Sequence, residues 1–159
     1  MMNNFNAALK ILDPKTSQRM ALREKLDIFF LDFGLMPLFV HENYLMAYGN
    51  TYEANCMQSI ASAADFISVG DLISIDVNIH QQWSLLPNLG LMSCVAPASV
   101  NKTGHLNYAP FPAIMGKMST MRKIYRLIKE IKEFCGPQLY ADKNAALTEY
   151  LPLIFQMIY

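Results

Sequence analysis

The sequence predicts an all-α protein, a bundle of about seven or eight helices. Three observations predict this class. Apolar residues recur with a helical period along most of the 159 residues. They make up 53% of the chain, and charged residues only 16%, which favours a packed core over disorder. One short segment alternates like a β-strand, but no other segment offers it a convincing partner.

Two helices are expected in the first 50 residues. The first spans residues 20–33, where apolar positions follow the spacing i, i+4, i+7, i+8, i+11. Thr16 or Ser17 could cap it, and Gly34 ends it. Pro37 suits the first turn of the second helix, because an N–H at that position would have no helical partner.

A third helix is expected over residues 52–67, followed by a segment with two interpretations. Residues 73–80 alternate apolar and polar side chains, which favours a strand. Leu72, Ile75 and Ile79 also form a helical stripe. We interpret residues 71–80 as helix, because a lone strand would leave its backbone groups unpaired.

The remaining segments continue the helical pattern. Ser84 could cap a helix over residues 85–95 that ends at Pro97, and residues 101–112 read as a loop with one Gly and two Pro. A strongly amphipathic helix is expected from Ser119 or Thr120 to Phe134.

Turn residues and an apolar end define the C-terminal part. Gly136 and Pro137 end the amphipathic helix, and Asp142 caps a last helix over residues 143–159. That helix ends on an apolar run, which suggests a chain cut from something longer. We therefore expect a lead-in at 1–17, a helical domain at 18–135 and the truncated start of a helical extension at 136–159.

The net charge is zero, but the charges are unevenly distributed. Residues 1–25 carry +3, residues 26–101 carry seven acids and no Lys or Arg, and residues 102–132 carry +6. The zero total gives no overall field toward nucleic acid or membrane. The chain also lacks an apolar run long enough to span a membrane and a secretory signal. Three unpaired cysteines indicate a reducing compartment.

Catalytic motifs are weak. The segment from Gly116 to Thr120 fails the Walker pattern, because Phe111 stands where Gly is needed to let backbone N–H groups wrap a phosphate. The three histidines and three cysteines lack metal-ligand spacing, so each His is expected at the surface or in a cap. Cys94 is interpreted as a buried thiol. Asp65 and Asp71 are interpreted as helix-end or cap residues.

Two features suggest binding. The amphipathic helix has a basic face that consists of Arg122, Lys123, Arg126 and Lys129. This face is either solvated, with i,i+4 ion pairs, or it contacts phosphate or an acidic partner. Trp83, the only Trp, is either a core or interface residue or a stacking surface for a base. Phe30 is a possible second stacking residue, although its place in an apolar stripe favours burial.

Five strings, in order and spacing, resemble the C-terminal helical region of the large subunit of replication factor C, the eukaryotic clamp loader. They are PLFVHENYL at 37–45, AADFISVGDL at 63–72, WSLLP at 83–87, MSCVAPAS at 92–99 and KIYRLIKEI at 123–131. The resemblance covers about residues 18–134. It departs at 113–116, where Ala-Ile-Met-Gly replaces the family's Ser-Trp-Leu-Gly, and past Phe134 only residues 149–152 match.

The resemblance implies an all-α collar domain of the clamp-loader type in a nuclear protein. In that family five subunits join through their collars into a ring that loads a sliding clamp onto primer–template DNA for replication and repair. ATP and Mg²⁺ belong to an ATPase module that precedes the collar and is missing here, so this chain itself would bind no cofactor and would be no enzyme. Contact with the sliding clamp would use that missing module.

The expected partners are the small subunits of the loader and primer–template DNA. The apolar segment at 37–44 is expected to pack either within the collar or against a neighbouring subunit. Its interface candidates are Pro37, Leu38, Phe39 and Tyr44. The alternatives are a helical protein–protein adaptor with no DNA role and, in another class, an enzyme that uses a Cys or carboxylate site.

Overall fold

A computed structural model describes residues 3–49, 54–102, 104–135 and 142–158. Every regular element in these ranges is helical, so the predicted all-α class is confirmed. Contacts divide the chain into two compact units, Met1–Pro112 (unit 1) and Ala113–Tyr159 (unit 2). The boundaries expected at residues 17 and 135 stay predictions.

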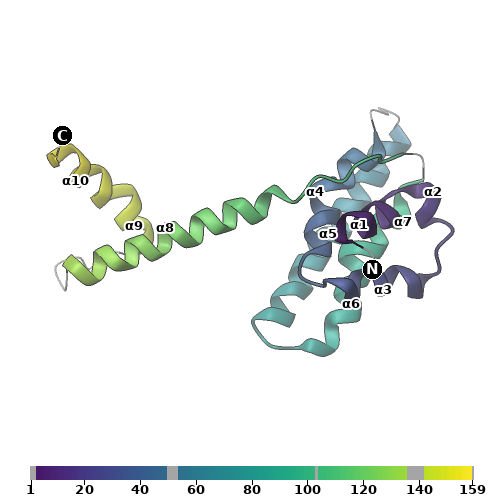
Figure 1. Ribbon diagram of the computed structural model, residues 1–159, viewed down its shortest axis with the longest axis horizontal. Coiled ribbons are helices and arrows are strands. Elements are labelled where there is room, and N and C mark those ends of the chain that lie inside the picture. The colour runs from purple at the N-terminus through teal and green to yellow at the C-terminus, as the bar shows by residue number, and fades with distance from the viewer. Residues whose placement is uncertain (1–2, 50–53, 103, 136–141, 159) are drawn as a thin grey trace. The chain divides into compact units, whose positions relative to one another are not determined.

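Unit 1 contains short and long helices joined by turns and loops (Figure 1). In chain order its elements are α1 (Asn4–Leu12), α2 (Pro14–Ser17), α3 (Leu22–Leu31), α4 (Met36–Tyr48), α5 (Ala54–Asn78), the 3₁₀ turn η1 (Trp83–Leu85), α6 (Leu86–Gly90), the π-helical turn η2 (Leu91–Val95) and α7 (Ala96–Val100). Unit 2 contains α8 (Ala113–Cys135), α9 (Lys143–Ala145), the π-helical turn η4 (Ala146–Tyr150) and α10 (Leu151–Ile158).

The core of unit 1 joins segments that are distant in the sequence. Phe39 of α4 is fully buried, and its ring centroid lies 5.3 Å from that of Phe5 in α1 and 5.7 Å from that of Phe111. Both contacts are edge-to-face, the arrangement that aromatic quadrupoles favour. Four residues of α1 are buried in the same core, so part of the expected lead-in packs with the helical domain.

The first two predicted helices are present, but the predicted cap of the first is wrong. Thr16 and Ser17 belong to α2, which Asp13 caps by accepting the N–H of Thr16. α3 begins after Ala21, whose N–H is instead satisfied by the Glu24 carboxylate at 3.0 Å. The short α2 separates the sequence-predicted cap from its helix, and local spacing does not reveal such an insertion.

The segment with two interpretations is helical. The helices predicted over 52–67 and 71–80 are one continuous helix, α5, whose described part reaches Asn78. Gly70 lies inside this helix and lets it pack closely on η2, because a Cβ there would lie 3.0 Å from the Cβ of Ser93. The helix satisfies its own backbone, so the local alternation has no structural effect.

Pro97 does not end the helix that precedes it, contrary to the prediction. The chain stays helical to Val100, because η2 widens into a π turn in which Ala96 N–H donates to Leu91 O, five residues back. The same arrangement recurs in unit 2: η4 precedes Pro152, and Leu151 N–H donates to Ala146 O. Proline has no N–H to donate, and its ring clashes with the carbonyl four residues back. In both places the wider π turn before the proline accommodates this ring and the missing hydrogen bond.

Polar side chains clamp the stretch that follows α7. The predicted loop is confirmed over its described residues, which form no helix or strand. Buried Asn43 donates to Phe39 O at 2.8 Å and Pro110 O at 3.1 Å, and Asn101 donates to Ala47 O at 3.0 Å. The bond to Pro110 O and the bond from Asn101 to Ala47 O tie the loop to α4 and give buried backbone carbonyls a partner.

Asp13 adds a titratable clamp. Its carboxylate lies 2.9 Å from Nδ1 of His105 in the loop and also accepts the N–H and the hydroxyl of Thr16. Burial raises the pKa of Asp13, but the hydrogen bonds from His105 and Thr16 outweigh it, so the pKa lies below its ordinary value.

In unit 2, α8 begins six or seven residues before the predicted start at Ser119 or Thr120, directly after Pro112. Ala, Ile, Met and Lys fill most of its first turns, and they sustain a helix without a Ser or Thr cap. The predicted end at Gly136 and Pro137 lies outside the described residues. The last predicted helix is divided into α9, η4 and α10, and Ala146 packs on Ile128 of α8.

We predict that Phe39→Ala destabilises the chain by about 3–5 kcal/mol, because it removes a fully buried ring and leaves a cavity between two others. Urea unfolding followed by circular dichroism measures the change. Leu45→Ala on the same helix is the matched control, since Leu45 is 53% exposed and should change stability by less than about 0.5 kcal/mol. Equal effects of the two substitutions would contradict the core assignment.

We predict that Asp13→Asn destabilises the chain at pH 7 by about 1 kcal/mol, because the charged hydrogen bond with His105 is removed while the helix cap is retained. The folded-state pKa of Asp13 is lowered, so its contribution is complete above the unfolded value of about 3.9 and disappears as pH falls through the folded value. Urea unfolding of both proteins should therefore give a difference that shrinks below about pH 4. A difference that stays constant or grows in acid would be inconsistent with this clamp.

Candidate nucleic-acid and partner interfaces

The segment that joins α5 to α6 lies at one end of unit 1 (Figure 1), and η1 within it begins at Trp83. Gln81 takes a left-handed backbone conformation, φ 58°, and turns the chain sharply before η1. Trp83 is 47% exposed, and its ring meets the ring of Phe33 edge-to-face at 6.4 Å. Its Nε1–H donates to Gln81 Oε1 at 3.2 Å. Trp83 is thus a surface residue that a neighbouring ring and a side-chain amide hold in place.

Phe30 is at the surface, contrary to the burial that its apolar stripe favours. It is 48% exposed, whereas its neighbour Phe29 is fully buried and meets it edge-to-face at 5.1 Å. The register of α3 turns Lys25, Ile28 and Phe29 inward. Phe33 is also exposed, at 43%, and sequence reasoning missed it as an aromatic surface residue. Phe33 lies beyond Leu31, the last residue of α3, so the helical spacing from Phe30 gave no signal of its exposure.

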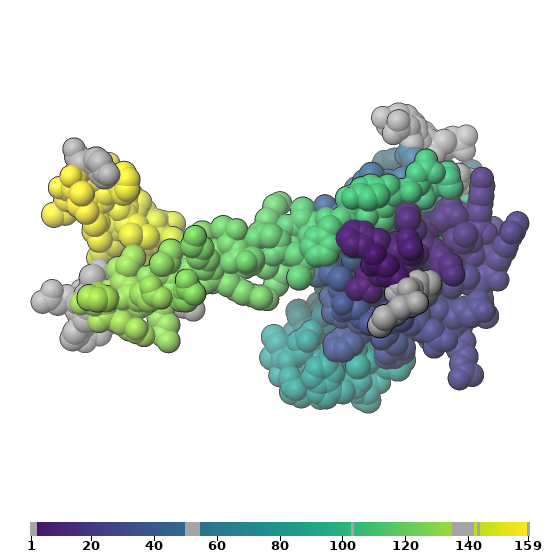
Figure 2. All heavy atoms as spheres, viewed as in Figure 1, coloured from purple at the N-terminus to yellow at the C-terminus, as the bar shows by residue number. Residues whose placement is uncertain are grey.

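This end of unit 1 is aromatic and free of basic residues. No Lys or Arg occurs between residues 26 and 101. The α5–α6 segment, in teal, forms the molecular surface at this end (Figure 2). Such a surface cannot attract phosphate by charge, but an exposed ring can stack on a base.

The basic face of α8 is solvent-exposed along its length. Arg126 Nε lies 3.6 Å from Glu130, and Lys129 Nζ lies 3.7 Å from Glu133, so both predicted i,i+4 pairs are present. All four side chains are more than half exposed, and such pairs contribute little. Within the described residues, Arg122 and Lys123 form no ion pair, which leaves their charges available to a partner.

The four interface candidates on α4 do not form one surface. Phe39 is fully buried in the chain's own core, so it offers no contact to a neighbouring subunit. Of the two expectations for this segment, packing within the domain therefore holds for Phe39. Pro37 and Leu38 are half-buried. Tyr44 is also half-buried and packs against the cluster of Tyr48, Cys56 and Ala63. The burial of these four side chains follows from the packing of α4 against α1, α3 and α5.

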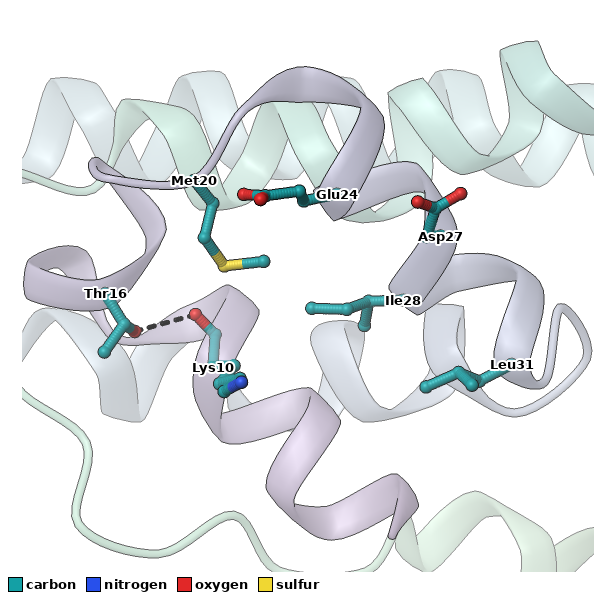
Figure 3. A pocket seen from close by; sticks show the side chains of 7 residues that line it. All are labelled: Lys10, Thr16, Met20, Glu24, Asp27, Ile28 and Leu31. Atoms are coloured by element: carbon teal, nitrogen blue, oxygen red, sulfur yellow. Dashed lines mark hydrogen bonds between the residues drawn. The ribbon is translucent and has the colours of Figure 1, made fainter. Parts of the chain in front are cut away.

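A cavity of about 420 Å³ opens between α1, α2 and α3 (Figure 3). Met20 and Ile28 point into it, and the carboxylates of Glu24 and Asp27 lie on one side. Lys10 lies on the other side, where its carbonyl accepts the Thr16 hydroxyl at 2.8 Å. Its lining residues include no His or Cys, and the carboxylates have no nucleophile beside them, so the cavity offers no catalytic set.

Cys94 is fully buried, as predicted, and burial raises its pKa to about 12. The thiolate needed for nucleophilic attack is therefore disfavoured.

Asp65 and Asp71 are exposed within the length of α5, so their interpretation as helix-end or cap residues is wrong. In the described part of the chain, no group of three or more His, Cys, Asp or Glu residues could hold a metal ion.

Lys25 is a charged residue that sequence reasoning did not single out. It is 8% exposed, and its Nζ donates to Ser99 Oγ at 3.4 Å. Burial lowers its pKa. The contact links α3 to α7 and is structural.

Among the described helices, none is long and apolar enough to cross a membrane.

The sequence of this chain is similar to that of known proteins. The family model for the replication factor RFC1 C-terminal domain matches residues 67–159. Replication factor C subunit 1 of Homo sapiens is 30% identical over 158 residues, which cover 96% of this chain and 14% of the relative. Its counterpart in Drosophila melanogaster is 30% identical over 94% of this chain and 15% of the relative.

The protein of the same name in Saccharomyces cerevisiae is 33% identical over 157 residues, which cover 93% of this chain and 18% of the relative. The similarity therefore extends beyond residues 18–134 to nearly all of this chain. The chain spans less than a fifth of the length of these curated relatives.

Proposed function

This chain belongs to the replication factor RFC1 C-terminal domain family, and from that premise we propose that it is a non-catalytic assembly domain of a clamp loader's large subunit. Its role would be to hold the large subunit to the small subunits and to contact primer–template DNA while a sliding clamp is loaded. The observation that carries the proposal is the family match over residues 67–159, together with similarity to proteins that are themselves named as subunits.

The distribution of surfaces supports both parts of this role. A helical unit with large exposed apolar side chains, such as Leu72 and Ile79, is suited to association with other subunits. Exposed Trp83 and Phe30 supply rings for base stacking, and Arg122 and Lys123 supply unpaired charge for phosphate or an acidic subunit. We propose the end of unit 1 as the contact for the terminal base pair of the junction.

The proposal places the ATP and Mg²⁺ chemistry, and contact with the sliding clamp, in parts of the large subunit outside this chain. It also places the protein in the nucleus, where replication takes place. The adaptor alternative without a DNA role is favoured by one observation: Glu130 and Glu133 partly neutralise the basic face of α8.

We predict that Trp83→Ala weakens binding of the assembled loader to a primer–template junction by about fivefold to a hundredfold, the effect of removing one stacked base. Fluorescence anisotropy with labelled junction DNA measures the change. Tyr108→Ala is the matched control, because Tyr108 is an exposed ring outside the proposed contact and should leave binding unchanged. A Trp83→Ala chain that folds, assembles and binds DNA normally would leave Trp83 without a DNA role.

We predict that replacing both Arg122 and Arg126 by Glu flattens the logarithmic salt dependence of junction binding, by roughly 0.9 for each phosphate that the helix no longer neutralises. Binding isotherms of the assembled loader at several salt concentrations give the slope. Lys15→Glu with Arg19→Glu, an equal charge change on unit 1, is the control and should leave the slope unaltered. An unchanged slope in the α8 variant would support the adaptor alternative.

A further inference from the structure

The second half of α5 exposes an apolar stripe that the chain itself leaves uncovered within unit 1. Val69, Leu72, Ile75 and Ile79 are 41%, 63%, 47% and 69% exposed. They recur every three or four residues and therefore share one face of the helix. Ile79 follows the last helical residue, but its N–H donates to Ile75 O at 2.8 Å, so it extends the same turn. We refer to these four residues as the α5 stripe.

The opposite face of α5 is fixed against the rest of unit 1. Ile67, Gly70 and Val77 are buried, and Gly70 packs directly on Ser93 of η2. α5 packs against α4, α6, η2 and α7. The helix cannot rotate its stripe inward without exposing this packed face, so the stripe is a rigid and outward-facing surface.

Acidic residues flank the α5 stripe. Asp65 lies seven residues before Leu72 and therefore nearly in line with it, and Asp71 and Asp76 border the stripe. Asp76 pairs with His80 at 3.0 Å. In the described part of the chain, Asp65 and Asp71 take part in no side-chain hydrogen bond or ion pair. No Lys or Arg stands anywhere between residues 26 and 101 to balance them.

We propose that the α5 stripe docks a helix of a neighbouring subunit, one that carries its own apolar stripe flanked by Lys or Arg. The inference rests on the proposed assembly function and assigns a surface and a partner chemistry to it. Apolar side chains at three- and four-residue spacing fit the ridges of a second helix. The unpaired carboxylates of Asp65 and Asp71 would meet the basic flanks, which favours correct partners and rapid association.

The same charges argue against other occupants. Nucleic acid is disfavoured, because its phosphates would face three carboxylates. An anionic membrane surface is disfavoured for the same reason. A second copy of this chain would place the same acidic patch against itself in a two-fold interface, where like charges repel. A helix with basic flanks avoids each of these costs.

The first test is an association measurement with the full-length large subunit and the purified small subunits. Leu72→Asp should weaken association by at least about tenfold, because it buries a carboxylate in an apolar contact. Leu22→Asp is the matched control: Leu22 is 55% exposed on α3, outside the stripe, and should leave association unchanged. Thermal melting of each variant establishes that it folds.

The second test addresses the partner's identity and charge. Asp71→Lys should slow association at low salt, and the difference from the native protein should fade as salt screens the charges. A photo-crosslinking amino acid at position 72 should attach to a small-subunit helix that contains Lys or Arg beside the attachment site. Normal association of the Leu72→Asp variant would overturn the inference, and so would crosslinking within this chain, to a second copy or to DNA. In each of these cases the proposed assembly function would still hold, provided that the native large subunit associates with the small subunits. Failure of the native subunit to associate at all would overturn both.

Discussion

The edge-to-face contacts of Phe39 with Phe5 and Phe111 are the interaction on which unit 1 depends. The three rings come from α1, α4 and the stretch before Pro112, so one buried side chain joins the two ends of the unit to its centre. The contact fixes α4, which in turn packs against α3 and α5. The aromatic end and the α5 stripe both stand on helices that this core positions.

Close backbone contacts determine how α5 and the segment after it fit together. Gly70 allows α5 to approach η2, and Gly90 lies so close to the ring of Phe29 that a Cβ there would be 2.6 Å from a ring carbon. The π turn in η2 keeps the chain helical through Pro97, so the packed surface continues into α7. As a result, α5 is anchored on one face and free on the other, and the turn that follows it presents Trp83 at the end of the unit.

The charges are separated between the units. Unit 1 carries a long stretch without Lys or Arg, and the surfaces proposed for binding on it are aromatic or apolar with acidic flanks. The basic face lies on α8 of unit 2, where Arg122 and Lys123 have no acidic partner in the described ranges. Surfaces of such different chemistry suit different partners: rings for a base, an acidic apolar stripe for a basic helix, and cations for phosphate or an acidic subunit.

The sequence by itself determined the helical class, the uneven charges and the ion pairs of α8, because apolar periodicity and i,i+4 spacing are local properties. The lack of a strand partner and the family resemblance, rather than the local alternation, supported helix over strand at residues 71–78, and the apolar neighbours of Cys94 supported its burial. Tertiary structure alone decided which aromatic side chains face inward: Phe29 and Phe39 are buried while Phe30 and Trp83 are exposed, since neighbouring helices set the register of each stripe. It also decided that Pro97 lies inside a helical segment and that Thr16 caps nothing in α3. Those outcomes depend on a π turn and an inserted short helix, which are stabilised by contacts between segments far apart in the chain.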